Sequence, residues 1–144
     1  MKILSSIIFG IGIATTSLPS LGDESGNLLV KLTGFESSQG KVMIALSRNE
    51  AEYKFKTTPY RNETLKLENK TSHWELDALP YGTYAIRFFH DENSNSELDT
   101  NFMGIPKEDY GFSNDAPARF GPPKFDMAKF VYSESVKVIS INVQ

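Results

Sequence analysis

The sequence of 144 residues contains no cysteine, one tryptophan and only two histidines, His73 and His90. Without cysteine the chain forms no disulfide and lacks the thiolate ligands of most structural zinc sites. The histidines belong to no His-Glu-x-x-His pattern, and no Gly-x-Ser-x-Gly pattern accompanies them. Stability must therefore come from an apolar core, with or without a bound ion.

The sequence also lacks an excess of basic charge. It has 15 Lys and Arg against 18 Asp and Glu, a formal net charge of -3. This balance gives no electrostatic reason to expect nucleic acid or an anionic membrane surface as a partner. With 40% hydrophobic and 23% charged residues, the composition is that of one globular domain that buries its own core.

The longest apolar run follows Met1 and Lys2 and extends from Ile3 to Ile13, before a polar, small-residue segment. At about 12 residues it is shorter than the roughly 20 that a membrane-spanning helix needs. This order predicts a signal peptide over residues 1–22, with a buried strand or an uncleaved anchor helix as alternatives. We expect residues 23–144 to be an exported domain, periplasmic or extracellular, with no stable membrane insertion after cleavage.

Alternating apolar residues predict seven short strands, at 27–35, 41–46, 64–67, 73–76, 84–90, 129–132 and 136–143. The turn at 37–40 suggests that the first two strands form a hairpin. Ser47 or Asn49 is expected to cap one helical turn that returns Tyr53 and Phe55 to the core. Many short strands with frequent turns favour an all-β fold, a single sandwich of immunoglobulin-like or transthyretin-like type.

The segment Leu79-Pro80-Tyr81-Gly82 predicts a tight connection, because proline presets φ and glycine tolerates positive φ. With Tyr84 it resembles the Leu-Pro-x-Gly-x-Tyr corner of transthyretin-like and collagen-adhesin B-type sandwiches. Trp74 lies in a predicted strand, where an indole is more often a core anchor than a ligand-stacking ring.

A long loop, residues 91–128, shows little periodicity, whereas most connections in compact domains have about 4 to 6 residues. Its apolar content is too high for a solvated linker, so we expect it to fold over the domain. Four of its aromatic rings, with neighbouring prolines, suggest a shelf for a glycan, a peptide or an envelope protein. The alternative is that these rings form the loop's own small core. They are Tyr110, Phe112, Phe120 and Phe125.

The start of this loop has oxygen-bearing side chains at Asp91, Asn93, Asn95 and Asp99. That spacing matches positions 1, 3, 5 and 9 of a calcium loop, in which the backbone of Glu97 would supply position 7. The loop is not an EF-hand, because Phe102 replaces the bidentate glutamate at position 12. Further ligands would be water or a distant carboxylate from Glu108, Asp109 or Asp115. The alternative is a turn in which Asn and Asp side chains bond their own backbone.

His90 and the neighbouring carboxylates suggest a second function class, an extracytoplasmic hydrolase or metalloenzyme. A histidine beside carboxylates can act as a general base, and Ser113 or Tyr110 would be its partner. Because His90 closes a predicted strand, we expect a structural histidine that at most contacts a ligand. The sequence therefore favours a non-enzymatic binding or structural module.

Three patterns in the long loop carry a family resemblance. They are His-Asp-Glu-Asn-x-Asn-x-x-Leu-Asp-x-Asn at 90–101, Gly-Ile-Pro-Lys-Glu-x-Tyr-Gly-Phe-Ser-Asn at 104–114 and Phe-Gly-Pro-Pro-x-Phe at 120–125. Together they resemble the bacterial exported family catalogued as domain of unknown function 2141, over roughly residues 28–143. The resemblance implies an extracytoplasmic sandwich and no known reaction. Ser96 stands where that family's pattern usually has glycine.

Overall fold

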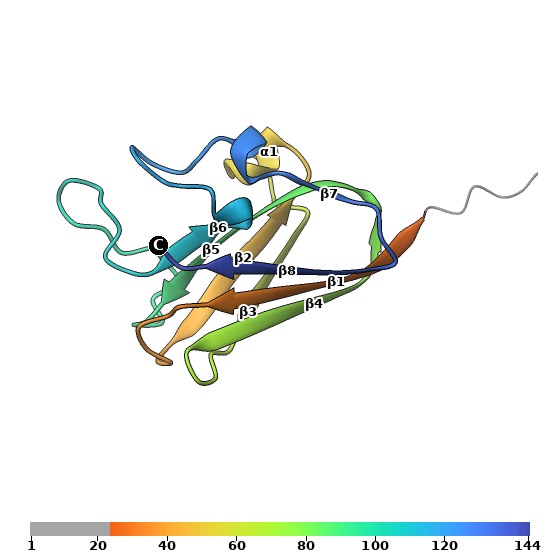
Figure 1. The fold of residues 1–144 in the computed structure, drawn as a ribbon. Helices are drawn as coiled ribbons and strands as arrows, with labels where there is room; N and C mark the ends of the chain where they lie inside the picture. The colour runs from red at the N-terminus through yellow and green to blue at the C-terminus, as the bar shows by residue number, and fades with distance from the viewer. Residues whose placement is uncertain (1–23) are drawn as a thin grey trace, which may run out of the picture.

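A computed structural model describes residues 24–144, which form a β-sandwich of two sheets (Figure 1). The predicted signal peptide lies outside the described residues. The elements, in chain order, are β1 (Ser25–Thr33), β2 (Lys41–Ser47), α1 (Glu50–Tyr53), β3 (Arg61–Leu65), β4 (Thr71–Pro80), β5 (Gly82–Asp91), β6 (Tyr110–Phe112), the 3-10 helix η1 (Ser113–Asp115), α2 (Phe125–Ala128), β7 (Phe130–Tyr132) and β8 (Val136–Asn142).

The first sheet has the order β4-β1-β8, with β1 antiparallel to β4 and parallel to β8. The predicted hairpin of the first two strands is therefore wrong. The turn at 37–40 carries the chain from β1 into the other sheet, and Gly40 makes this possible with φ +73° and a close approach to the backbone of Asp91. Alternation identifies the buried face of a strand, but it does not identify the partner strand.

The second sheet has the order β3-β2-β5-β6, and β7 pairs with the start of β5. Within residues 24–144 there are eight strands rather than the predicted seven, because the three-residue strand β6 lies inside the long loop. Such a strand is too short to show alternation. The all-β sandwich itself is confirmed.

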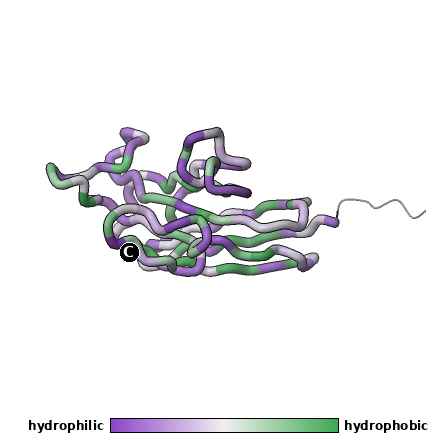
Figure 2. Tube along the Cα trace, turned by 90° about the horizontal axis from the view of Figure 1, so that it is seen from above, coloured by the Kyte–Doolittle hydropathy of each residue, from purple (hydrophilic) through white to green (hydrophobic). Residues whose placement is uncertain are grey.

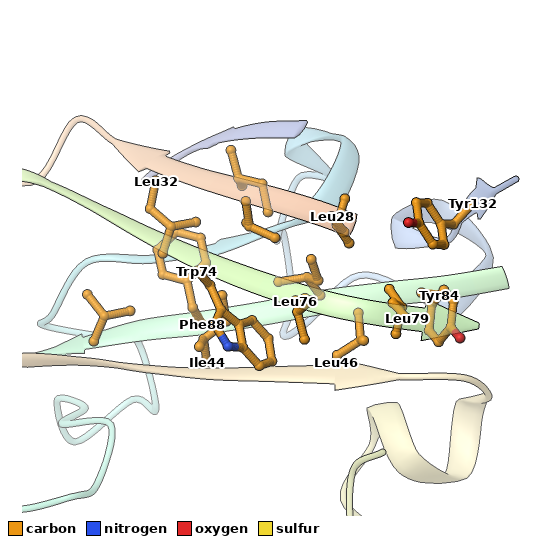
Figure 3. Close-up of a cluster of buried hydrophobic side chains, with 14 of the residues drawn as sticks. Leu28, Leu32, Ile44, Leu46, Trp74, Leu76, Leu79, Tyr84, Phe88 and Tyr132 are labelled. Atoms are coloured by element: carbon orange, nitrogen blue, oxygen red, sulfur yellow. The ribbon is translucent and has the colours of Figure 1, made fainter. Parts of the chain in front are cut away.

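The main core fills the space between the two sheets (Figure 3). Leu28 and Leu32 from β1 face Ile44 and Leu46 from β2, and Trp74 from β4 is 7% exposed, as expected of a core anchor. Seen from above, the paired strands alternate between hydrophobic and hydrophilic residues (Figure 2). This alternation is what a strand with one buried face requires.

The Leu-Pro-Tyr-Gly segment is a corner between the sheets, since β4 ends at Pro80 and β5 begins at Gly82. Asn49 caps α1 and accepts a hydrogen bond of 3.0 Å from the Glu52 N–H, as predicted. Tyr53 is buried, but Phe55 is 53% exposed, so the expectation that both return to the core is wrong for Phe55. Phe55 lies just beyond α1 with φ +54°, which turns its ring toward the outer face of the second sheet.

Candidate functional site

The outer face of the second sheet carries apolar side chains although it faces away from the main core. In β2 and β5 the residues between the core positions are Met43, Ala45, Arg87 and Phe89. Met43 pairs with Phe89, and Ala45 pairs with Arg87. Apolar residues on both faces of a strand indicate that both faces are covered. This outer face is the floor of the candidate site.

The long loop supplies two arms over that floor, which project from the same side of the domain (Figure 1). The first arm comprises residues 92–109, and the second arm comprises residues 113–128. Between them lies a groove of about 870 Å³. Its floor includes Met43, Ala45, Arg87, Phe89, Tyr110 and Phe112. Its walls include Leu98, Thr100, Met103, Ile105 and Pro106 from the first arm and Ala118, Arg119, Phe120 and Pro122 from the second.

The first arm follows Asp91, the last residue of β5, whose side chain is fully buried. Its Oδ1 accepts a hydrogen bond of 3.0 Å from the Asn95 N–H, and its Oδ2 accepts one of 2.9 Å from the Ser96 N–H. The Lys41 Nζ lies 3.5 Å from Oδ2 and balances part of the charge. Ser96 adopts a positive φ of +67° in this turn. Asp91 thus fixes the direction in which the arm leaves the sheet.

The other predicted calcium ligands gather around the same turn. The carboxylate of Asp99 accepts hydrogen bonds from the amide groups of Asn93 and Asn95. The Asn93 Oδ1 accepts the Asn95 N–H at 3.0 Å, and the Asn95 Oδ1 accepts the Glu97 N–H at 2.8 Å. The structure therefore brings Asp91, Asn93, Asn95 and Asp99 together, and hydrogen bonds within the turn engage their oxygens.

These contacts are those of an Asx-rich turn, and they leave the calcium prediction untested. Within residues 24–144, no group of three or more His, Asp or Glu side chains is placed to hold a metal ion. A calcium site here would instead combine two carboxylates with amide and backbone oxygens.

Glu108 closes the first arm and was named from the sequence only as a distant ligand. Its buried carboxylate accepts the Glu92 N–H and the Asp99 N–H, both at 3.0 Å. One side chain thereby ties the start, the middle and the end of the arm together. The Asp109 carboxylate instead accepts the Glu36 N–H, and Asp115 accepts the Asn142 N–H. Of the three distant carboxylates, only Glu108 bonds to the predicted ion-binding turn.

His90 is fully buried on the core side of β5 and is not among the residues that line the groove. Its Nε2 donates to the Gln39 carbonyl, and its ring packs edge-on against Phe35 at 5.2 Å between centroids. Its Nδ1 has no hydrogen-bond partner among the described residues and lies 3.5 Å from Glu92 and 3.9 Å from Asp109.

The hydroxyl groups named as partners of His90 are engaged elsewhere or make no bond to it. The Ser113 Oγ accepts the Ile86 N–H at 2.8 Å and contacts the carbonyl oxygen of Ala128 at 2.5 Å. No hydrogen bond joins Tyr110 to His90 in the described part of the chain. The structure does not assemble a nucleophile and a base from these residues.

The second arm has a small core of its own beside α1. Buried Tyr53, Ala85, Phe112, Ala116 and Ala128 form this cluster, with Tyr110 and Phe125 packed against it. Phe125 therefore belongs to the loop's own core, whereas Tyr110 and Phe112 also border the groove. Phe120 is fully exposed on the groove wall. Three of the four rings named for the predicted aromatic shelf therefore line the groove, and their contact with a ligand stays a prediction.

Arg87 is the charged residue in the groove floor, and no site was assigned to it from the sequence. Its Nη1 donates to the Tyr53 carbonyl at 2.9 Å, and its guanidinium lies 4.3 Å from the centre of the Phe55 ring. Burial lowers the pKa of Arg87, an effect that nearby Tyr53 opposes. In the sequence, Arg87 alternates with Ala85 and Phe89 on the outward face of the predicted strand. This pattern is the feature that could have identified Arg87 as a site residue.

The groove and both arms lie within a segment that matches a known family. Residues 30–140 match the model described as "Uncharacterized protein conserved in bacteria (DUF2141)". The chain belongs to this family. The match confirms the resemblance carried by the long loop, and the family's description assigns no activity to DUF2141 proteins. No curated protein and no solved structure matches the chain.

The described part of this DUF2141 protein contains no helix long and apolar enough to cross a membrane.

Proposed function

We propose that this DUF2141 protein is an exported binding module, not an enzyme, and that its ligand lies in the groove between the two arms. The observation that carries the proposal is the groove itself, at about 870 Å³ over a mainly apolar floor. Ligand sites typically measure about 300 to 1,000 Å³ and combine apolar walls with few polar groups.

Exposed apolar side chains on both arms support the same conclusion. Met103 is 69% exposed, Ile105 is 53% exposed and Phe120 is fully exposed, and all three line the groove. Apolar residues gathered on one surface usually mark an interaction site. Because the buried carboxylates of Asp91 and Glu108 hold the first arm in place, little conformational entropy is lost when a ligand binds.

The geometry favours binding over hydrolysis. A general base must come within hydrogen-bond reach of the proton that it removes. The His90 ring is fully buried and lies on the opposite face of the second sheet from the groove. A ligand in the groove therefore has no access to the histidine that an enzyme would use.

Calcium belongs to this proposal as a structural ion. Asp91, Asn93, Asn95 and Asp99, with the Glu97 carbonyl, would hold it at the origin of the first arm. With two carboxylates the affinity should be weak, on the order of the 10⁻⁴ to 10⁻³ M of extracellular modules. The ion would stabilise the arm without entering the groove.

The partner and the location follow from the same proposal. Export through the predicted signal peptide would place the groove in the periplasm or outside the cell. The ligand would be a glycan, a peptide or an envelope protein. Their hydroxyl or backbone groups would need polar partners, which the groove floor supplies sparingly.

A neutral apolar dye tests the binding function. We expect the purified chain to bind Nile red saturably, with a rise in fluorescence. Ile105→Glu places a charge on the groove wall and should weaken binding by at least about fivefold, because an apolar ligand cannot solvate that charge.

Val138→Glu is the matched control, since Val138 has the same 53% exposure but lies on β8 of the other sheet. It should leave the affinity within about twofold of the unaltered protein. Any dye bound to residues 1–23 is common to all variants and cancels in the comparison. Absence of saturable binding, or equal loss in both variants, would contradict the proposal.

A further inference from the structure

The two arginines Arg48 and Arg87 differ in whether a carboxylate balances their charge. Arg48, whose side chain is 53% exposed, bonds to the Glu52 carboxylate at 2.8 Å. Arg87 is more buried, yet no carboxylate lies within 4 Å of it among residues 24–144. The other charged residues that line the groove, Arg119 and Glu63, are both exposed. The interior of the groove therefore presents one unneutralised positive charge.

The guanidinium also has unused hydrogen-bonding capacity. It carries five N–H donors, and the bond to the Tyr53 carbonyl engages one of them. A desolvated cation with free donors is costly unless an anion pairs with it. The planar guanidinium matches a carboxylate through two parallel hydrogen bonds. Arg87 is thus complementary to a single acidic group.

The rest of the floor suits a hydrocarbon chain better than a peptide. Strand β2 is paired on both sides by β3 and β5, and β5 is paired by β2 and β6. Their backbone groups are already bonded, so an extended peptide would find few partners on the floor for its own N–H and C=O groups. An acyl chain has no such groups. Met43, Phe89 and Ile105 offer it side-chain contacts alone.

We propose that the groove binds a free long-chain fatty acid, with the acyl chain along the apolar floor and the carboxylate paired to Arg87. This inference rests on the proposed binding function and names the chemical class of its ligand. Arg87 is then the residue that selects the acid over neutral lipids of the same length.

Titration with cis-parinaric acid and with its methyl ester tests the inference, because the two fluorescent probes share one chain and differ in headgroup charge. In the unaltered protein the acid should bind at least about tenfold more tightly than the ester, as a charge-assisted pair implies. Arg87→Met keeps an apolar stem of similar length. It should reduce the affinity for the acid to that for the ester and leave the ester unchanged.

Arg61→Met is the matched control, because it removes an exposed arginine of β3 that does not line the groove. It should change the acid affinity by less than about twofold. Arg87→Lys keeps the charge without the planar donor pair and should give an intermediate affinity. Cooperative unfolding of each variant, followed by Trp74 fluorescence, confirms that it is folded.

The possible failures are distinguishable. Equal binding of acid and ester by the unaltered protein would overturn the fatty-acid inference and leave the binding function standing. Equal weakening of both probes by Arg87→Met would do the same, since it would assign Arg87 a purely structural role. If neither probe nor Nile red binds, both the inference and the proposed function fail. The comparison of acid with ester holds even if Arg87→Met does not fold.

Discussion

The Tyr84 hydroxyl donates a hydrogen bond of 2.7 Å to the carbonyl oxygen of Pro80, across the corner where the chain passes from one sheet to the other. Tyr84 is 3% exposed and packs against Tyr132. The bond fixes the corner from inside the core, which explains why tyrosine rather than phenylalanine stands there. Tyr84→Phe should lower the free energy of unfolding by about 1 kcal/mol, as measured by urea denaturation.

Tyr81→Phe is the control for this prediction. Tyr81 lies in the same corner, but its hydroxyl makes no hydrogen bond within the described part of the chain. It should change the free energy of unfolding by less than about 0.5 kcal/mol. Equal effects of the two substitutions would show that the Tyr84 hydrogen bond has no special role.

Gly111 allows β6 to approach β5. A Cβ atom at this position would lie 2.6 Å from the Phe88 ring and 3.1 Å from the Asn142 carbonyl. Gly111→Ala should therefore destabilise the protein by about 1 to 3 kcal/mol through overpacking. Gly82→Ala is the comparison, because its nearest contact would be an ordinary 3.5 Å to Tyr84. Thermal denaturation should separate the two variants, and similar melting temperatures would contradict the close approach.

Calcium should stabilise the protein if it occupies the turn at Asp91. At ten times the Kd the gain is about 1.4 kcal/mol, which raises the melting temperature by several degrees. Asp99→Asn should abolish the calcium-dependent part at little cost in chelator, since Asp99 accepts only side-chain amide groups. Differential scanning calorimetry with calcium and with chelator measures both effects.

Asp91→Asn should behave differently from Asp99→Asn. Both carboxylate oxygens of Asp91 accept backbone N–H groups, so replacing one oxygen by an NH₂ group sets donor against donor. We expect a loss of about 1 to 3 kcal/mol even in chelator. Cleavage between Phe102 and Phe125 should also be faster in chelator than in calcium. Equal melting temperatures and cleavage rates in both conditions would leave a hydrogen-bonded turn without an ion.

Glu52 should make stability depend on acid pH. Desolvation by burial raises the pKa of Glu52, but hydrogen bonds from the Arg48 side chain and backbone outweigh it, and the net pKa is below its ordinary value. As the pH falls, the unfolded chain takes up the proton first. Stability is therefore complete above the ordinary glutamate pKa of about 4.3 and decreases as the pH falls through the lower folded value.

Glu52→Gln should remove this part of the pH dependence, which urea denaturation at about pH 7 and about pH 3.5 measures. Glu50→Gln is the matched control in the same helix, because the Glu50 pair with Lys54 is exposed to solvent and screened. Glu50→Gln should change the pH dependence of the free energy of unfolding less than Glu52→Gln does. If the free energy of unfolding of Glu52→Gln falls with decreasing pH as much as that of the unaltered protein, the acid sensitivity must come from other carboxylates.

Much of the sandwich could be predicted from period-two alternation, because each strand buries one face. The sequence correctly predicted that Trp74 is a core anchor and that Tyr84 and Phe88 lie on the same buried face of a strand. It also correctly predicted the tight connection at Pro80. Strand partners could not be predicted in the same way. The turn that ends at Gly40 has the sequence of a hairpin turn, but it connects β1 of the first sheet to β2 of the second sheet. No residue in the turn indicates that the two strands belong to different sheets.

The candidate site was predicted only in part. The spacing from Asp91 to Asp99 indicated one ordered turn, because Asn and Asp side chains form hydrogen bonds with groups that are close in the sequence. The groove depends on residues far apart in sequence, Met43 and Arg87 on the floor and Phe120 on the wall, which only the folded sheet brings together. The apolar outward face of β2 and β5 was the available signal.

The parallel pairing of β1 with β8 has a consequence for the order of folding. Thr33 and Asn142, paired at one end of this ladder, are 109 positions apart. Contacts over such separations form slowly, because a long loop must close before any stabilisation is gained. Until β8 has been synthesised, β1 keeps one free edge and the first sheet has only two strands. If the proposed export takes place, this delay would keep the chain unfolded, and therefore able to cross a membrane, until β8 has been synthesised.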